Sequence, residues 1–260
     1  MKLHNVVLSA VAAFALASVT TSVVQAGERP HSWTGFYLGG HLGYGWQAND
    51  NRLRDLDGYN NGGARGGISG DFSYAADGGF GGVQAGFNLQ WQKVVAGIEG
   101  DFGLGFAGQA QFPAFVGERT PADSVASVDF ARYATVTGRL GLLATDRVLI
   151  YGKAGWGWTH ANVSFTDSDP FGSTLTSGTS RSANLDGAVW GGGIEYAVNS
   201  MLSFKVEYLR FDIGETVTHT ATSTSSPENP RFAHDIRDVH TVKVGVSIKF
   251  GDDRSSRPVK

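Results

Sequence analysis

Eight stretches of this sequence alternate apolar and polar residues with a period of two. They cover approximately residues 34–46, 79–90, 93–106, 129–143, 147–160, 186–198, 201–213 and 238–250. A period of two is typical of a β-strand with one apolar face, whereas a helix repeats about every 3.6 residues. Long helical periodicity is absent, so the sequence predicts an all-β fold of eight strands.

The connections between these strands alternate in length without exception. Long ones span about residues 47–78, 107–128, 161–185 and 214–237, and tight ones lie near 90–92, 145–146 and 199–200. In an antiparallel up-and-down meander, successive connections lie at opposite ends. Outer-membrane barrels have this form, with long extracellular loops and short periplasmic turns. A hairpin hidden in the second long connection would add two strands, and this alternative stays open.

Each strand carries large apolar side chains on one face and small, polar or charged ones on the other. In 93–106, Val94, Ile98 and Phe102 share one face, and Glu99 and Asp101 share the other. The interior of an eight-stranded barrel is only just wide enough to be filled by side chains. Dozens of large apolar side chains would overfill it, whereas glycine, threonine, serine and a few charged side chains fit. The pattern therefore predicts an eight-stranded antiparallel up-and-down transmembrane β-barrel with its apolar face toward lipid.

Eight ionisable residues on the polar faces are predicted to lie in the lumen. They are Glu99, Asp101, Arg139, Lys153, Glu195, Lys205, Glu207 and Lys243. An unpaired basic side chain facing lipid at the midplane would cost ~2–4 kcal/mol. Inside the barrel, the four acids and four bases can pair, which offsets much of the cost of removing them from water. The sequence predicts a plugged, charge-filled lumen rather than a wide water pore.

Aromatic residues recur near the ends of the predicted strands. The interface between membrane and water favours aromatic rings, because one edge of the ring stays wet. The expected interface aromatics are Trp33, Phe36, Trp46, Trp91, Trp158 and Phe250. The alternative is that they are ordinary core aromatics, and the set is stronger evidence than any one member.

The N-terminal residues have the composition of a secretory signal peptide. Lys2 precedes an apolar stretch over about residues 6–19, and small residues follow up to Ala26. That stretch is shorter than the about 20 residues that a spanning helix needs. We expect a cleaved signal peptide over 1–26, with cleavage after Ala17 as an alternative, then a barrel domain over 27–250 and a polar tail over 251–260.

Composition and motifs point away from several classes of function. The formal net charge is −3 at pH 7, which lacks the basic excess of a nucleic-acid-binding protein. The chain has no cysteine and no G-x-S-x-G, H-E-x-x-H or P-loop motif. Residues 55–61 faintly resemble a calcium loop but lack its twelfth-position glutamate, so solvated carboxylates are favoured. We expect no catalytic, metal or cofactor site and no nucleic-acid partner.

Three stretches carry a family resemblance. They are WTGFYLGGHLGYGW (33–46), VWGGGIEYAV (189–198) and TVKVGVSIKF (241–250). They resemble the outer-membrane immunogenic, porin-like proteins of alphaproteobacteria, a family of OmpA-type eight-stranded barrels. The family usually ends at the aromatic that corresponds to Phe250, whereas this chain continues as GDDRSSRPVK.

The resemblance implies a surface antigen in the cell outer membrane of a Gram-negative bacterium. It implies contact with outer-membrane lipid and lipopolysaccharide, and recognition of the C-terminal strand by the barrel assembly machinery. It also implies loops that could bind host or phage ligands. Some family members are associated with heme, which makes His219 and His234 in the last long connection candidates. Two solvated loop histidines are the favoured interpretation.

Three functions remain open from the sequence. The leading one is a structural and surface-interaction role for a rigid barrel anchored in lipid. The second is a narrow porin for small solutes, gated by the lumen charges. The third is a soluble, lipocalin-like barrel that binds an apolar ligand and would carry its apolar face inside.

Overall fold

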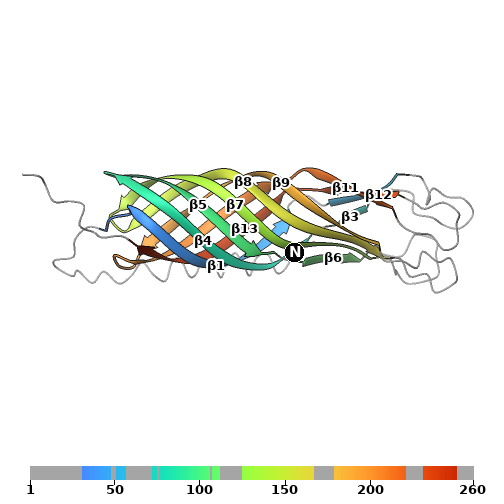
Figure 1. Cartoon of the computed structure of the whole chain (residues 1–260), viewed down its shortest axis with the longest axis horizontal. Helices are drawn as coiled ribbons and strands as arrows, with labels where there is room; N and C mark the ends of the chain where they lie inside the picture. The colour runs from blue at the N-terminus through green and yellow to red at the C-terminus, as the bar shows by residue number, and fades with distance from the viewer. Residues whose placement is uncertain are drawn as a thin grey trace, which may run out of the picture. The chain divides into compact units, whose positions relative to one another are not determined.

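Eight long antiparallel strands close into a barrel in the computed structural model (Figure 1). They are β1 (Gly35–Gln47), β4 (Asp77–Trp91), β5 (Val94–Leu104), β7 (Val125–Thr145), β8 (Val148–Thr166), β9 (Thr179–Ala197), β10 (Leu202–Asp212) and β13 (Val239–Phe250). Each strand pairs with its neighbours along the chain, and β1 also pairs with β13, which closes the wall. The predicted eight-stranded antiparallel barrel is confirmed.

The structure describes residues 31–47, 51–56, 72–74, 76–105, 107–111, 125–166, 179–220 and 231–250. Residues 31–260 form one unit. The predicted leader and tail lie outside the described residues and stay predictions. In the described part of the chain, no helix has the length and apolar character needed to cross a membrane.

The second long connection does not add a hairpin to the barrel wall. It contributes β6 (Ala107–Gln111), which pairs with the start of β7, while β5 pairs with the rest of β7. β6 therefore continues the path of β5 along the same partner. The alternative with two more barrel strands is wrong, because this segment extends an existing strand.

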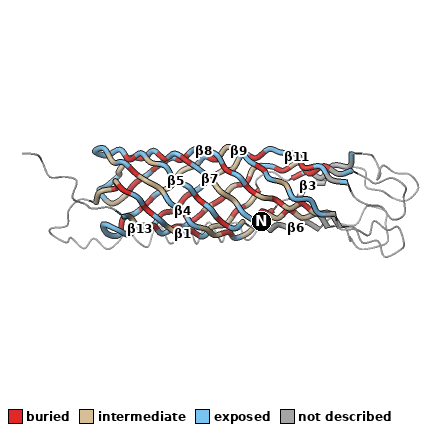
Figure 2. The backbone as a smooth tube through the Cα atoms, viewed as in Figure 1, coloured by how far each residue is buried: buried red, intermediate tan, exposed pale blue. Residues whose placement is uncertain are grey.

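Buried residues recur between more exposed ones along the barrel strands (Figure 2). On β5, Ile98 is 67% exposed, whereas its neighbour Glu99 is 1% exposed. On the far wall, Val244 is 45% exposed and Lys243 is 3% exposed. The apolar faces of these strands point outward as predicted. The interpretation as a soluble barrel with an apolar interior is therefore wrong for the part of the barrel that holds these charged residues.

Beyond the long-connection end of the apolar belt, the inward-facing positions become apolar and the outward-facing positions become polar. On β8, Trp158 faces outward in the belt, whereas Ala161 and Val163, further along, are fully buried on the inner face. The outward position next to Trp158 is polar, and the Nδ1 atom of His160 lies 2.7 Å from Oδ1 of Asn184. An apolar inner face and a polar outer face are typical of a sheet in water. The switch between Trp158 and His160 therefore marks where the wall leaves the apolar belt.

Beyond this switch the nine-stranded sheet continues with β6 and the ends of β7, β8 and β9. A separate four-stranded sheet has the order β11-β12-β2-β3. The strands of the second sheet are β2 (Asn51–Asp55), β3 (Phe72–Tyr74), β11 (Glu215–Thr220) and β12 (Arg231–Ile236). We call this continuation and the four-stranded sheet together the cap. The predicted long loops are thus partly strands.

An apolar core lies between the two sheets of the cap. The buried residues of this core are Ala76, Phe80, Val128, Phe130, Ala161, Val163, Leu185, Ile213, Val217, Ile236 and Val239. Most of them lie on β7, β8 and β9 in one sheet or on β11 and β12 in the other. The rest lie on β4 and β13 or just before β4 and β11. The cap is therefore stabilised like a small water-soluble domain, by burial of apolar surface.

A pair of buried amides connects the barrel to the cap. Gln47 and Asn51 donate to each other through their side-chain amides, each at 2.7 Å. The Oε1 atom of Gln47 also accepts from the backbone of Ala76 at 2.9 Å, and Oδ1 of Asn51 accepts from the backbone of Arg237 at 2.9 Å. Buried amides need hydrogen-bond partners. This pair therefore fixes the segments around residues 47–51, 76 and 237 relative to one another.

The outward orientation of the belt makes a measurable prediction. Replacing Ile98 with arginine should lower the free energy of unfolding by ~2–4 kcal/mol, because a charge would face lipid near mid-belt. Urea unfolding of the protein in lipid vesicles measures this loss. Thr218→Arg, at an exposed position of the cap, is the control and should change stability by less than about 0.5 kcal/mol. Equal losses for both variants would contradict the orientation.

Candidate functional site

An apolar layer lies inside the barrel at its tight-turn end. Trp33, Val95, Leu149, Tyr151 and Ala197 form one buried cluster there. The backbone N–H of Trp33 donates to the side chain of Gln90 at 2.8 Å. The cluster lies at the end of the barrel where the short turns are.

Trp33 was expected at the membrane interface, and this prediction is wrong. The residue is 2% exposed and packs inside the barrel. The physical reason is parity: Trp33 lies four residues before Tyr37, whose side chain also points inward. The apolar side chains at the mouth give the indole a dry site that the outer wall does not offer.

The other five expected interface aromatics lie on the outer wall. Phe36, Trp91, Trp158 and Phe250 are 66%, 78%, 48% and 53% exposed. Trp46 is half-buried because its ring stacks on His240 at 5.9 Å between centroids. Their positions suit a membrane interface, and the assignment stays a prediction.

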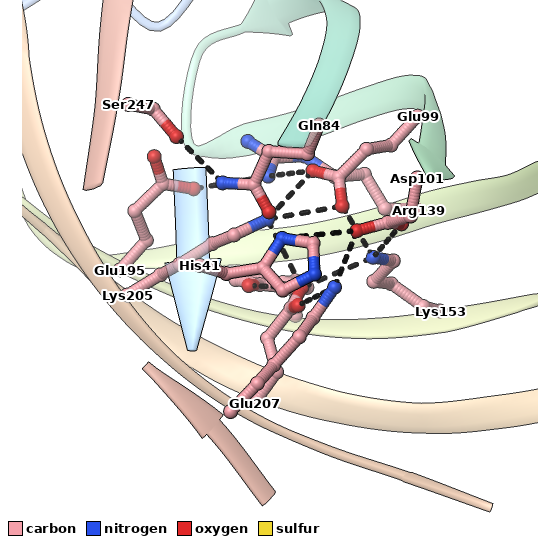
Figure 3. Close-up of polar contacts among 12 residues, drawn as sticks. His41, Gln84, Glu99, Asp101, Arg139, Lys153, Glu195, Lys205, Glu207 and Ser247 are labelled. Atoms are coloured by element: carbon pink, nitrogen blue, oxygen red, sulfur yellow. Dashed lines mark hydrogen bonds and ion pairs between the residues drawn. The ribbon is translucent and has the colours of Figure 1, made fainter. Parts of the chain in front are cut away.

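All eight charged residues predicted for the lumen lie inside the barrel, where they form an ionic layer above the apolar one. The members Glu99, Asp101, Arg139, Lys153, Glu195, Lys205, Glu207 and Lys243 are each at most 5% exposed. Figure 3 shows most of them converging on one region of the lumen. Four acids meet four bases, so the ionic layer has no formal net charge.

Glu99 is one centre of the ionic layer. Its carboxylate accepts hydrogen bonds from Lys153 at 2.5 Å and from Lys205 at 2.8 Å. The hydroxyl of Tyr37 donates to it at 2.6 Å. These three donors come from β8, β10 and β1 and meet β5 across the lumen.

Glu207 is the second centre. It lies 2.9 Å from the ammonium of Lys243 and 3.1 Å from that of Lys153. Tyr151 donates its hydroxyl proton to the carboxylate at 2.7 Å. Lys243 also donates to Asp101 at 2.6 Å. Lys153 contacts both centres, so the two carboxylates belong to one connected network.

Arg139 is held in a flat slot toward the apolar layer. Its guanidinium lies 5.1 Å from the ring centroid of Tyr37 and 4.9 Å from that of Tyr151, a cation–π arrangement. Its Nη1 donates to Glu195 at 2.9 Å, and its Nε donates to Asn88 at 2.9 Å. The stacking and the ion pair together fix the guanidinium plane.

Sequence reasoning missed His41, which borders the ionic layer. Its Nε2 lies 2.5 Å from the hydroxyl of Tyr133, and its Nδ1 lies 3.7 Å from Oδ1 of Asp101. The signal was present, since His41 shares the inward parity of Tyr37. A carboxylate, an imidazole and a phenol in line can relay a proton. Among the described residues, however, no serine lies next to His41 to serve as a nucleophile.

Among the residues considered for heme and calcium, the structure describes the side chain of His234. His234 lies on β12 with a fully buried side chain, so the interpretation as a solvated loop histidine is wrong for this residue. The side chain of His219 and most of 55–61 lie outside the described part of the structure. Within the described residues, no three His, Cys, Asp or Glu side chains are grouped to hold a metal ion.

A closed antiparallel barrel with an apolar outer belt and buried charged residues inside defines an integral outer-membrane β-barrel protein. Residues 9–250 match the family model described as the outer membrane protein beta-barrel domain. The chain belongs to this family, and its place is the outer membrane of a Gram-negative cell. The cap is therefore extracellular and the tight turns are periplasmic.

The chain is similar to two proteins named 31 kDa outer-membrane immunogenic protein, from Brucella melitensis and Brucella suis. Each is 30% identical over 243 residues, which cover 93% of this chain and 94% of the relative. The predicted resemblance to the alphaproteobacterial family is confirmed. Among solved structures, the outer membrane protein OprG from Pseudomonas aeruginosa shares the fold with a TM-score of 0.55 at 14% identity, covering 85% of this chain and 98% of that chain.

Proposed function

We propose that the protein is a non-conducting anchor that presents its cap at the cell surface, with a structural and surface-interaction role. The observation that carries this proposal is the filling of the lumen in successive layers. An apolar layer around Trp33 lies below the ionic layer, and the apolar core of the cap lies above it. Each layer is a separate barrier to a hydrated ion.

The ionic layer supports the same role because its charges are already paired. An ion that enters would have to lose its water and compete with contacts as short as 2.5 Å. Removing a charge from water is costly, and the existing partners of Glu99 leave little to offset that cost. The filled lumen, with His41 bound to Tyr133 and no adjacent nucleophile among the described residues, also supports our proposal that the protein is not an enzyme.

The outer rim of the barrel supports a contact with lipopolysaccharide. Trp46, His240, Arg210 and Trp190 are register partners on four neighbouring strands. The guanidinium of Arg210 lies 5.5 Å from the ring centroid of Trp190 and pairs with Asp238. Aromatic and basic side chains at this level suit the phosphates and sugars of the outer leaflet.

Host or phage ligands would meet the cap, and the assembly machinery would meet β13 through Phe250.

Conductance across a planar bilayer tests the proposal. The purified protein should give no stable nanosiemens-scale steps, because all three layers block the lumen. A wide porin inserted into the same bilayer is the positive control for conductance, and anomalous gel migration before boiling shows that the barrel is folded. Stable stepwise conductance would instead support the narrow-porin alternative. Such conductance should then change when Lys205 is replaced with methionine.

Heme binding at the extracellular side has weaker support. His234 is fully buried on the inner face of the cap, so an iron atom could reach it only after the cap opened. An unchanged heme affinity in the His219→Ala/His234→Ala double variant would remove this candidate.

A further inference from the structure

Three hydrogen-bonded pairs of polar side chains lie on the outward face of β7, β8 and β9 beyond the apolar belt. Each pair joins register partners on neighbouring strands, and its two bonded atoms lie 2.6 or 2.7 Å apart. The pairs are His160 with Asn184, Asn162 with Ser182, and Ser164 with Ser127. We call these six residues the polar ladder.

The polar ladder continues the lipid-facing surface along an unbroken strand. β8 runs from the barrel into the cap (Figure 1), so Trp158 at the border of the belt and His160 above it lie on one face of one strand. From His160 to Ser164 the strand advances about 13 Å, at about 3.3 Å per residue. Because the cap is extracellular, the polar ladder meets the groups that the outer leaflet carries directly above its lipid. In a Gram-negative outer membrane these groups are the sugars of lipopolysaccharide.

The hydrogen bonds within the polar ladder determine what it can recognise. Oδ1 of Asn184 can only accept, so Nδ1 of His160 carries the proton, and Nε2 of the neutral imidazole keeps its lone pair. Oδ1 of Asn162 is likewise engaged by a serine hydroxyl. These bonds use the amide oxygens, and the amide N–H groups of Asn162 and Asn184 take no part in them. The polar ladder thus presents donors beside an acceptor, which suits sugar hydroxyls because each can both donate and accept.

The charges on the same outward face favour an uncharged sugar over a phosphate. Their register positions place Asp129, Arg132 and Asp186 on this face. Two acids and one base give a formal charge of −1, so a phosphate would meet net repulsion. Trp158, which is 48% exposed, offers an apolar ring face to the C–H groups of a sugar at the lower border. The rim at Arg210 has the opposite character, since its guanidinium suits an anion.

We propose that the polar ladder is a docking surface for the uncharged sugar residues of the lipopolysaccharide that surrounds the barrel. The amides of Asn162 and Asn184 donate to sugar hydroxyls, and Nε2 of His160 accepts from one. The proposal rests on the surface-interaction role proposed above and adds to it a second contact with a different part of the same glycolipid. Its failure would leave the non-conducting anchor standing, because conductance tests that function separately.

Titration of the full chain in phosphatidylcholine nanodiscs tests the proposal. The probe is the dephosphorylated core oligosaccharide of lipopolysaccharide, isolated from the cells that carry the protein and freed from its lipid. The side-chain amide NMR signals of Asn162 and Asn184 should shift and saturate, because their N–H groups bind the probe. Asn162→Ala and Asn184→Ala should each weaken binding by about fivefold, the value of one neutral hydrogen bond. The remaining asparagine reports the binding in each variant.

One control variant and two charged probes make the test specific. Thr218→Ala, at an exposed position on the four-stranded sheet of the cap, should leave binding unchanged. The phosphorylated core oligosaccharide should bind no more tightly than the dephosphorylated one, and a sialylated host oligosaccharide should bind more weakly because it carries a carboxylate. The proposal is overturned by the absence of a saturable shift, by tighter binding of either charged probe, or by equal weakening in Thr218→Ala.

Discussion

Replacing Glu99 with glutamine is expected to lower the free energy of unfolding by about 3–5 kcal/mol. The carboxylate is 1% exposed and accepts from Lys153 and Lys205. Glutamine keeps the size of the side chain but removes its negative charge. The ammonium groups of Lys153 and Lys205 then lose the carboxylate that they share. Urea unfolding of the folded barrel in lipid vesicles measures the loss.

A double-mutant cycle separates the ion pair from other effects of this substitution. Glu99→Gln together with Lys205→Met removes one charge of each sign, so the double variant should be less destabilised than the sum of the single variants. Glu215→Gln, at an exposed position of the cap, should change stability by less than about 0.5 kcal/mol. Additive losses in the cycle would show that Glu99 and Lys205 do not stabilise each other.

Replacing Trp33 with alanine is expected to cost about 3–5 kcal/mol, the usual range for removing a large aromatic side chain from a packed core. The indole is buried against Val95 and Leu149 at the periplasmic end, whereas residues near the end of a domain often tolerate change. The urea midpoint of the variant in vesicles gives the measurement.

Trp91→Ala is the matched control for this prediction. Trp91 is 78% exposed, lies at the same periplasmic end and faces outward, so its removal leaves no internal cavity and should cost less. A loss for Trp33→Ala no larger than that for Trp91→Ala would contradict the assignment of Trp33 to the lumen.

The members of the ionic layer could be predicted from the sequence, but their partners could not. Parity along each strand placed all eight charged residues in the lumen. In the ladder, Lys205 is the register partner of Glu195, yet its ammonium bonds to Glu99, which is 106 residues away. Arg139 and Lys153, which carry like charges, are also register partners. Which side chains meet across a barrel depends on strand tilt and stagger, and no local pattern specifies these.

The cap was missed because its strands lie in segments rich in turn-forming residues. Composition marked 161–185 as a loop, although Ala161 and Val163 continue the inward parity of β8. Once a strand leaves the membrane, water becomes the outer solvent, so the apolar residues belong inside. Looking for a change in the apolar face along one continuous strand, as between Trp158 and His160, would have found both the cap and the membrane boundary.

The sequence by itself determined the number of membrane strands, their order and the face that each presents to lipid. These properties follow from a period of two and from the alternation of long and short connections, which are local. The tertiary structure decided which acids meet which bases, and it placed Trp33 and the core of the cap at opposite ends of the ionic layer. These properties arise only when the closed wall brings side chains from opposite strands into contact, and the packing that results is a property of the whole barrel.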